Sequence, residues 1–221
     1  MEESTSKEKM LKSIRNALIH KSEPPVIIGN PERKFYVPMT DTLDITFAEE
    51  FTKVNGNFVY CEDIPALIDN LKSVFIENNW SAVFTADLQL EKVLKAAEIP
   101  CSTSQEDFLK TKVGVTFCES LVARVGAIVI SSKQTAGRKL NIYPETHVVV
   151  AMASQIVPDV QTALKGLREK YVNQFPSLIS IITGPSISFG IENLKVTGAT
   201  GTRHLFVFLV DDSPENTEDG K

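Results

Sequence analysis

Short, continuously apolar stretches alternate with amphipathic ones along this chain, and this alternation restricts its fold more than any other feature. Apolar runs of strand length include GAIVIS (126–131), THVVVAMAS (146–154) and RHLFVFLVD (203–211). A strand that is apolar at every position is buried on both faces, as in parallel sheets covered by helices. The sequence therefore predicts an α/β fold: an open, mostly parallel sheet with helices on both faces.

The amphipathic stretches between these runs carry helix signals. The segment 63–79 starts with Asp63 as a cap and has Pro65 in its first turn, which favours a helix start. Residues 44–56 place Phe47, Phe51 and Val54 on one face. Segments 86–98 and 158–172 have the same character, so strands and helices alternate from residue 44 onward.

The N-terminal region differs from the rest of the chain. Residues 6–21 form an amphipathic pattern typical of a helix, and the proline-rich segment that follows cannot continue it. We therefore expect residues 1–35 to be a helix and linker, residues 36–212 the α/β domain, and residues 213–221 a disordered acidic tail. The helix could dock on the domain, on a second copy or on a partner, which leaves a homo-oligomer open.

Composition excludes several function classes. The chain has 221 residues, 43% hydrophobic and 23% charged, with a net charge of -5, so it lacks the basic footprint of a nucleic-acid-binding protein. It has no apolar run of the roughly 20 residues needed to cross a membrane, and its first residues do not form a signal peptide. We expect a cytoplasmic protein. The three cysteines form no C-x-x-C pair, so no metal site or cofactor is predicted.

One corner of the sequence suggests ligand binding. Gly184, Pro185 and Ser186 follow the apolar strand SLISIITG, at a position expected beyond the carboxyl end of a sheet strand. If a helical turn begins near Ser186, its N–H groups favour an anion, and Ser188 would lie beside it. The alternative is a tight turn in which Ser186 only caps the following segment.

Three further residues are candidates for the same site. Arg138 lies in a glycine-containing loop flanked by Lys133 and Lys139, and a guanidinium can hold a carboxylate or phosphate in a bidentate manner. His147 opens a strand and is a candidate general base, or it hydrogen-bonds a neighbouring backbone group. Glu192 is a candidate catalytic carboxylate or a capping residue. The sequence does not decide whether either of these two residues is catalytic.

The order of motifs in the second half resembles the LUD-domain family of the lactate utilization protein C type. The motifs are GVTFCESLVARVGAIVIS, AGRKLNIYPETHVVVAMASQIVP and ITGPSISFGIENLKVTGATGTRH, and the resemblance covers roughly residues 113–211. Family positions are matched by Arg138, Pro144, His147, Gly184, Pro185, Ser186, Ile191, Glu192, Gly198 and Gly201. The chain departs from the family's polar pattern at Val125, Ala127, Gly190 and Thr200.

The resemblance implies a fold like that of ribose-phosphate isomerases and CoA transferases. It also implies a component of an L-lactate utilization system, which oxidises L-lactate to pyruvate with iron–sulfur partner proteins and in which this chain has no redox centre of its own. A second function stays open on the same fold: a stand-alone enzyme or binding protein for a small anionic metabolite such as a CoA ester, a sugar phosphate or a carboxylate.

Overall fold

The computed structural model describes residues 5–19, 38–135, 138–189 and 195–213. They fall into two units that divide after Pro38. The first unit holds helix α1 (Ser6–Ile19), as the amphipathic pattern predicts. Thr5 and Glu8 form a reciprocal cap at its start: the Thr5 N–H donates to Glu8 Oε2 at 2.9 Å, and the Glu8 N–H donates to Thr5 Oγ1 at 3.4 Å.

The second unit is built on a six-stranded sheet in which every neighbouring pair is parallel. Its strands lie in the order β1 (Asn57–Cys61), β12 (His204–Val210), β7 (Thr146–Met152), β4 (Val113–Phe117), β2 (Val83–Phe84) and β3 (Cys101–Ser102). The central strands β12 and β7 are almost wholly buried, which explains their continuously apolar sequences.

Helices α3 (Ile64–Glu77) and α4 (Leu88–Ala96) cover one face of this sheet. Each starts at an aspartate cap: Asp63 accepts from the Ala66 N–H at 2.7 Å, and Asp87 accepts from the Gln89 N–H at 2.8 Å. Leucines of both helices pack on valines and phenylalanines of the strands, forming the first core. A short helix, α5 (Gln105–Phe108), follows β3.

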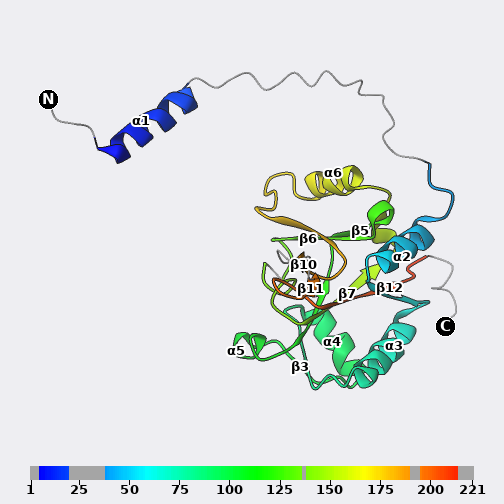
Figure 1. The fold of residues 1–221 in the computed structure, drawn as a ribbon. Helices are drawn as coiled ribbons and strands as arrows, with labels where there is room; N and C mark the ends of the chain where they lie inside the picture. The colour runs from blue at the N-terminus through cyan, green and yellow to red at the C-terminus, as the bar shows by residue number, and fades with distance from the viewer. Residues whose placement is uncertain (1–4, 20–37, 136–137, 190–194, 214–221) are drawn as a thin grey trace. The chain divides into compact units, whose positions relative to one another are not determined.

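The opposite face is covered by helix α2 (Leu43–Lys53) and by a second sheet. This sheet has the order β8 (Ile156–Val157), β5 (Ser120–Val122), β6 (Ala127–Ser131) and β9 (Ile179–Thr183), and β6 is antiparallel to both of its neighbours. Helix α6 (Val160–Lys170) packs on its outer side. Figure 1 shows the layers, with α6 above the second sheet and α3 and α4 below the six-stranded sheet.

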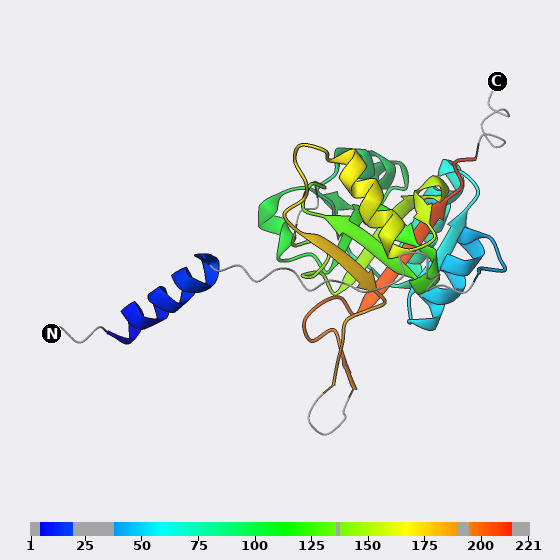
Figure 2. The same cartoon turned by 90° about the horizontal axis from the view of Figure 1, so that it is seen from above.

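Three small elements complete the domain. The 3₁₀ turns η1 (Ala123–Val125) and η2 (Ala153–Gln155) follow β5 and β7. A two-stranded hairpin, β10 (Ile187–Phe189) and β11 (Lys195–Thr197), follows β9, and Figure 2 shows it standing away from the layers.

The predicted fold class is confirmed, since a parallel sheet carries helices on both faces. The second sheet was not predicted. Strand β6 is buried at all five positions because it lies between the six-stranded sheet and α6. Its sequence is therefore continuously apolar, like that of a parallel strand, although β6 is antiparallel to its neighbours. The predicted acidic tail beyond Ser213 lies outside the described residues.

Candidate functional site

The strand order of the six-stranded sheet marks one place for a ligand. Strand β2 leads through α4 to β3 on one side, whereas the neighbouring β4 leads to β7 on the other side. The loops that leave these two strands therefore separate and open a crevice at their carboxyl ends. Ligands of open α/β sheets bind at such a reversal point, which makes this crevice our candidate functional site.

A cavity of about 230 Å³ occupies the crevice. Ala86 and Asp87 line it from the end of β2, and Thr116 and Cys118 from the end of β4. The loop after β6 and the end of α6 close it with Lys133, Gln134, Thr135 and Lys170. The lining is thus mainly polar and carries two lysines.

A buried carboxylate pairs with one of the two lysines that line this cavity. The side chain of Glu119, two residues beyond β4, is 2% exposed and pairs with Lys170 Nζ at 2.7 Å. Its Oε1 accepts hydrogen bonds from Ser131 Oγ at 2.5 Å and from the Tyr171 hydroxyl at 2.9 Å. A buried carboxylate needs this kind of complete partnering. The cluster ties β4, β6 and α6 together beside the cavity.

Protonation states favour binding over covalent chemistry in this crevice. The hydrogen bond from Lys170 to Glu119 raises the pKa of the Lys170 ammonium, so Lys170 is a cation at neutral pH. Burial, followed by the hydrogen bond to Glu119, raises the pKa of Tyr171. Burial also raises the pKa of the Cys118 thiol to about 12, which keeps it from acting as a thiolate nucleophile. The arrangement can therefore hold an anion electrostatically.

A second cavity, of about 600 Å³, adjoins the first and shares Ala86 and Thr135 with it. Its lining is polar and apolar in about equal parts, and three aromatic rings contribute to the apolar part. The rings of Phe84 and Phe108 lie 5.3 Å apart between centroids, and those of Phe108 and Tyr143 lie 5.6 Å apart. Leu109, Leu140 and Lys139 contribute the rest of this wall together with Thr103.

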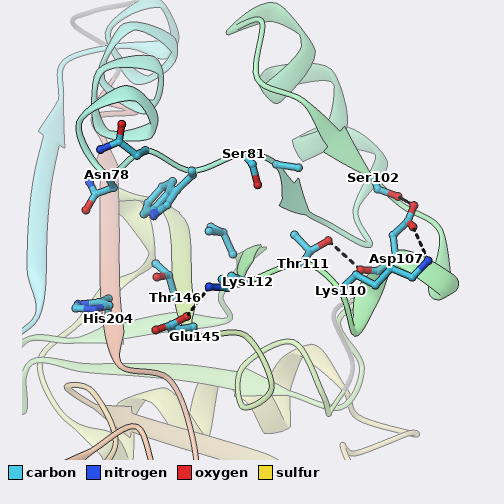
Figure 3. Close-up of a pocket in the computed structure, with 14 residues that line it drawn as sticks. Asn78, Ser81, Ser102, Asp107, Lys110, Thr111, Lys112, Glu145, Thr146 and His204 are labelled. Carbon is cyan, nitrogen blue, oxygen red and sulfur yellow. Dashed lines mark hydrogen bonds and ion pairs between the residues drawn. The ribbon is translucent and has the colours of Figure 1, made fainter.

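Another hollow lies at the opposite edge of the sheet. It measures about 660 Å³, and Val113, Thr146 and His204, the first residues of three parallel strands, line it. Figure 3 shows its acidic groups already facing partners: Glu145 lies 3.8 Å from Lys112, and Asp107 accepts from Ser102 Oγ at 2.7 Å. It lies at the amino edge, away from the strand ends where ligands collect.

The structure places Arg138 on the crevice side of the domain. Its guanidinium donates to Ser177 Oγ at 2.5 Å, just before β9 begins. Ser177 Oγ lies 3.2 Å from Ser132 Oγ, and Ser132 directly follows Ser131 of the Glu119 cluster. Arg138 is thus near the buried carboxylate network and at the amino end of β9.

Gly184, Pro185 and Ser186 lie at the far end of β9, so they do not meet Arg138. The five residues of β9 between them span roughly 13 Å at about 3.3 Å per residue. The Ser186 N–H donates to the Thr202 carbonyl at 2.9 Å, and its own carbonyl accepts from the Gly198 N–H at 2.8 Å. These partners precede β12, which places the turn at the amino edge of the six-stranded sheet.

No helical turn begins near Ser186, so the condition for its N–H groups to favour an anion is not met. The chain continues into β10, where Ser188 pairs with Val196 of β11. The sequence argument assumed that β9 belongs to the parallel sheet, so that its carboxyl end would be a ligand-binding edge. However, β9 is an edge strand of the second sheet and runs antiparallel to β6. Its carboxyl end therefore lies near the amino ends of the strands of the six-stranded sheet. Glu192 lies outside the described residues.

His147 is fully buried in the sheet and does not reach the turn or Arg138 through a hydrogen bond. Its Nε2 lies 2.9 Å from Thr116 Oγ1, and Thr116 lines the smaller cavity. Burial lowers the pKa of His147 to about 4, so the ring is neutral at neutral pH. Glu145, the carboxylate nearest to His147 in sequence, and Glu119 hydrogen-bond to other side chains.

Sequence reasoning missed Lys170 and Tyr171 and did not assign Glu119 a partner. Lys170 and Tyr171 are 51 and 52 residues from Glu119, and only the packing of α6 on the second sheet brings them next to it. One local signal could have drawn attention to Lys170 and Tyr171: they are polar residues at the end of a helix whose buried residues, Ala163 and Leu167, are apolar.

With this geometry in place, comparison with known proteins identifies the family. The LUD domain model matches residues 46–210. The chain belongs to the LUD domain family. The LUD domain therefore includes both sheets and the whole crevice, from α2 to the end of β12.

Relatives of this LUD domain include several lactate utilization proteins C. The one from Macrococcus caseolyticus is 28% identical over 209 residues, covering 86% of this chain and 90% of the relative. The one from Bacillus subtilis is 35% identical over 105 residues, covering 47% of this chain and 44% of the relative. A match from Geobacillus thermodenitrificans is 26% identical and covers 78% of this chain and 73% of the relative.

A solved structure supports the fold of the LUD domain. The crystal structure of a DUF162 family protein from Deinococcus radiodurans superposes with a TM-score of 0.57 over 76% of this chain and 96% of that chain. The sequence identity is 15%, so this likeness bears on the fold alone.

Two further observations concern the described residues of the LUD domain and of α1. Among them, no three His, Cys, Asp or Glu side chains gather in a way that could hold a metal ion. No helix there combines the length and the apolar character needed to cross a membrane.

Proposed function

We propose that this protein is a component of an L-lactate utilization system and that it binds a small organic anion in the crevice between β2 and β4. The similarity to lactate utilization protein C along most of both chains carries the first part of the proposal. The crevice carries the second part, because it combines the topological reversal point with two lysines.

The charge distribution around the crevice supports anion binding. Lys133 and Lys170 line the cavity, and Arg138 and Lys139 lie on the same side of the domain in a chain whose net charge is -5. Lys170 also pairs with Glu119, so Lys133 is the main cation offered to a ligand inside the cavity. Asp87 also lines the cavity, but its carboxylate already accepts backbone N–H groups at the start of α4. In this proposal Arg138 contributes positive charge at the rim of the crevice. The turn at Gly184 takes no part in the site, because it lies at the far end of β9.

The proposal includes iron–sulfur partner proteins that carry out the electron transfer, so this chain itself has no redox centre. The resemblance to the lactate utilization family supports this division of labour. The described cysteines are consistent with it, since Cys61, Cys101 and Cys118 are separate free thiols. A visible absorption band that stays with the purified chain through gel filtration contradicts this part.

A stand-alone protein for another small anion is the second candidate. The observation that favours it is the polar crevice itself, which would bind a carboxylate or a phosphate without any partner protein. Purification from native cells separates the two: a complex with cysteine-rich proteins supports the first candidate, and an isolated chain that turns over or binds a phosphate supports the second.

Growth on L-lactate as sole carbon source tests the role, and isothermal titration with L-lactate and pyruvate tests the site. A strain lacking the gene should grow poorly on L-lactate and recover with the wild-type chain. Lys133→Ala should fail to restore full growth and should weaken binding of the anion about 10-fold. Lys165→Ala, an exposed lysine on the outer side of α6, is the matched control. Normal growth of the deletion strain on L-lactate would refute the proposed role.

A further inference from the structure

The two cavities at the carboxyl edge adjoin each other and differ in chemistry. They share Ala86 and Thr135 as lining residues, so a ligand that extends past these two residues would reach from one cavity into the other. The smaller end carries Lys133 and Lys170, and the larger end carries the rings of Phe84, Phe108 and Tyr143. A ligand anchored by its anionic group at the first end points its remaining atoms toward the second.

The size of the larger end does not fit lactate. A water molecule takes up about 30 Å³ of liquid, so the six heavy atoms of lactate need on the order of 100 Å³. The smaller cavity, at about 230 Å³, already accommodates such an anion. The additional cavity of about 600 Å³ remains for a much larger substituent.

The chemistry of the larger end specifies that substituent. The three rings form a continuous edge-to-face series, with interplanar angles of 68° and 62°. At its mouth, the side chains of Tyr143 and Leu109 are 64% and 76% exposed. Exposed apolar side chains gathered around a cavity mark binding sites, and aromatic walls favour a planar ring that packs against them.

We propose that the ligand of this site is an organic anion that carries an aromatic or planar ring. The ring lies in the cavity lined by Phe84, Phe108 and Tyr143, and the anionic group lies beside Lys133 and Lys170. This inference rests on the proposed anion site in the crevice and adds the ligand class: an aryl-substituted hydroxy or oxo acid, or a ring-bearing phosphate, in place of a three-carbon acid.

Isothermal titration of the full chain with four probes tests the ligand class. The probes are L-lactate (anion alone), benzyl alcohol (ring alone), L-phenyllactate (ring and carboxylate) and adenosine monophosphate (ring and phosphate). We expect at least one of the two ring-bearing anions to bind about 10-fold or more tightly than L-lactate, because a buried ring adds apolar contact area. The better of the two identifies the anionic group.

Substitution of Tyr143 tests the position of the ring. Tyr143→Ala should weaken binding of the ring-bearing anion about 3- to 10-fold, because the proposed ring packs against the Tyr143 side chain. It should leave L-lactate binding unchanged, because L-lactate has no ring to reach Tyr143. Tyr143→Phe keeps the ring and should retain the affinity. Tyr60→Ala removes an exposed tyrosine from β1, at the opposite side of the sheet, and is the matched control. Thermal melts confirm that each variant is folded.

The outcomes separate this inference from the proposed function. Equal affinity for L-lactate and L-phenyllactate, with no gain for adenosine monophosphate, overturns the ring site while the lactate role stands. Tight binding of a ring-bearing anion that depends on Tyr143 supports the ring site even if the deletion strain grows normally on L-lactate. Loss of affinity for every probe alike in Tyr143→Ala also overturns it.

Discussion

Gly184 lies directly against the backbone carbonyl of Val54: a Cβ atom added to Gly184 would stand 2.2 Å from the Val54 oxygen. Its φ of 71° is also in the left-handed region that other residues avoid. The glycine therefore lets the end of β9 approach the end of α2, so the Gly184-Pro185-Ser186 turn contributes to the packing of the domain. Because Gly184 lies at the opposite edge of the six-stranded sheet from the crevice, it is not expected to contact a ligand bound there.

We predict that Gly184→Ala lowers the free energy of unfolding by about 2–4 kcal/mol, combining the backbone strain with the steric clash. Chemical denaturation measures the change. Gly166→Ala is the control, because Gly166 lies in α6 with nothing within 4 Å of an added Cβ. That variant should be more stable than wild type by about 0.5–1 kcal/mol. An unchanged free energy of unfolding in Gly184→Ala would show that Gly184 does not lie against the Val54 carbonyl.

His147 should make the protein sensitive to acid. Burial lowers its pKa from 6.5 to about 4, so below pH 6.5 the unfolded chain takes up a proton that the folded chain does not. The free energy of unfolding should therefore fall as the pH drops from 6.5 to 4, by about 3 kcal/mol from this residue.

Urea denaturation of wild type and His147→Gln at several pH values measures this contribution. The variant should lose stability less steeply between pH 6.5 and 4. Thr116→Val removes the hydrogen-bond partner and keeps the imidazole, so it should retain the steep dependence. Parallel curves for wild type and His147→Gln would contradict the prediction.

Glu119 and Lys170 should be energetically coupled. Lys170→Met leaves a buried carboxylate without its cation, and we expect a loss of about 1–3 kcal/mol, moderated by the 60% exposure of the lysine side chain. Adding Glu119→Gln should recover part of this loss, because the neutral amide no longer needs a cation. A double-mutant cycle measures the coupling, expected at about 1–2 kcal/mol. The exposed pair Lys165–Glu169, 3.9 Å apart on the same helix, should give under about 0.5 kcal/mol.

Removal of the first unit should leave the LUD domain folded. Residues 1–35 were expected to be a separate helix and linker, and the family match begins at residue 46. We predict that a chain starting at Met39 melts cooperatively, within a few degrees of the full chain. Differential scanning calorimetry of both chains decides the matter, and a truncated chain without a cooperative transition would place α1 in the folding unit.

The helices and the parallel sheet could be predicted because their signals are local. Asp63 and Asp87 cap helices by hydrogen bonds to residues two or three positions away, and the apolar runs of β7 and β12 report burial on both faces. Such signals survive in a single sequence.

The candidate site could not be predicted because it depends on which strands become neighbours. The same apolar pattern fits β6 in an antiparallel sheet and β4 in a parallel one. Assigning β9 to the wrong sheet moved Ser186 to the wrong edge. Glu119 meets Tyr171 only after two sheets and α6 have packed together, and no local pattern encodes that contact.

The pairing of β12 between β1 and β7 has a consequence for synthesis on the ribosome. The first strand of the domain finds its hydrogen-bonding neighbour in the last one, with Asn57 opposite Phe206. Until His204–Val210 has left the exit tunnel, β1 has no partner in the sheet and β7 has one open edge. From the synthesis of β7 until that of β12, the nascent chain therefore carries unpaired edges on two strands, which are the kind of edge that pairs with other chains when it is exposed.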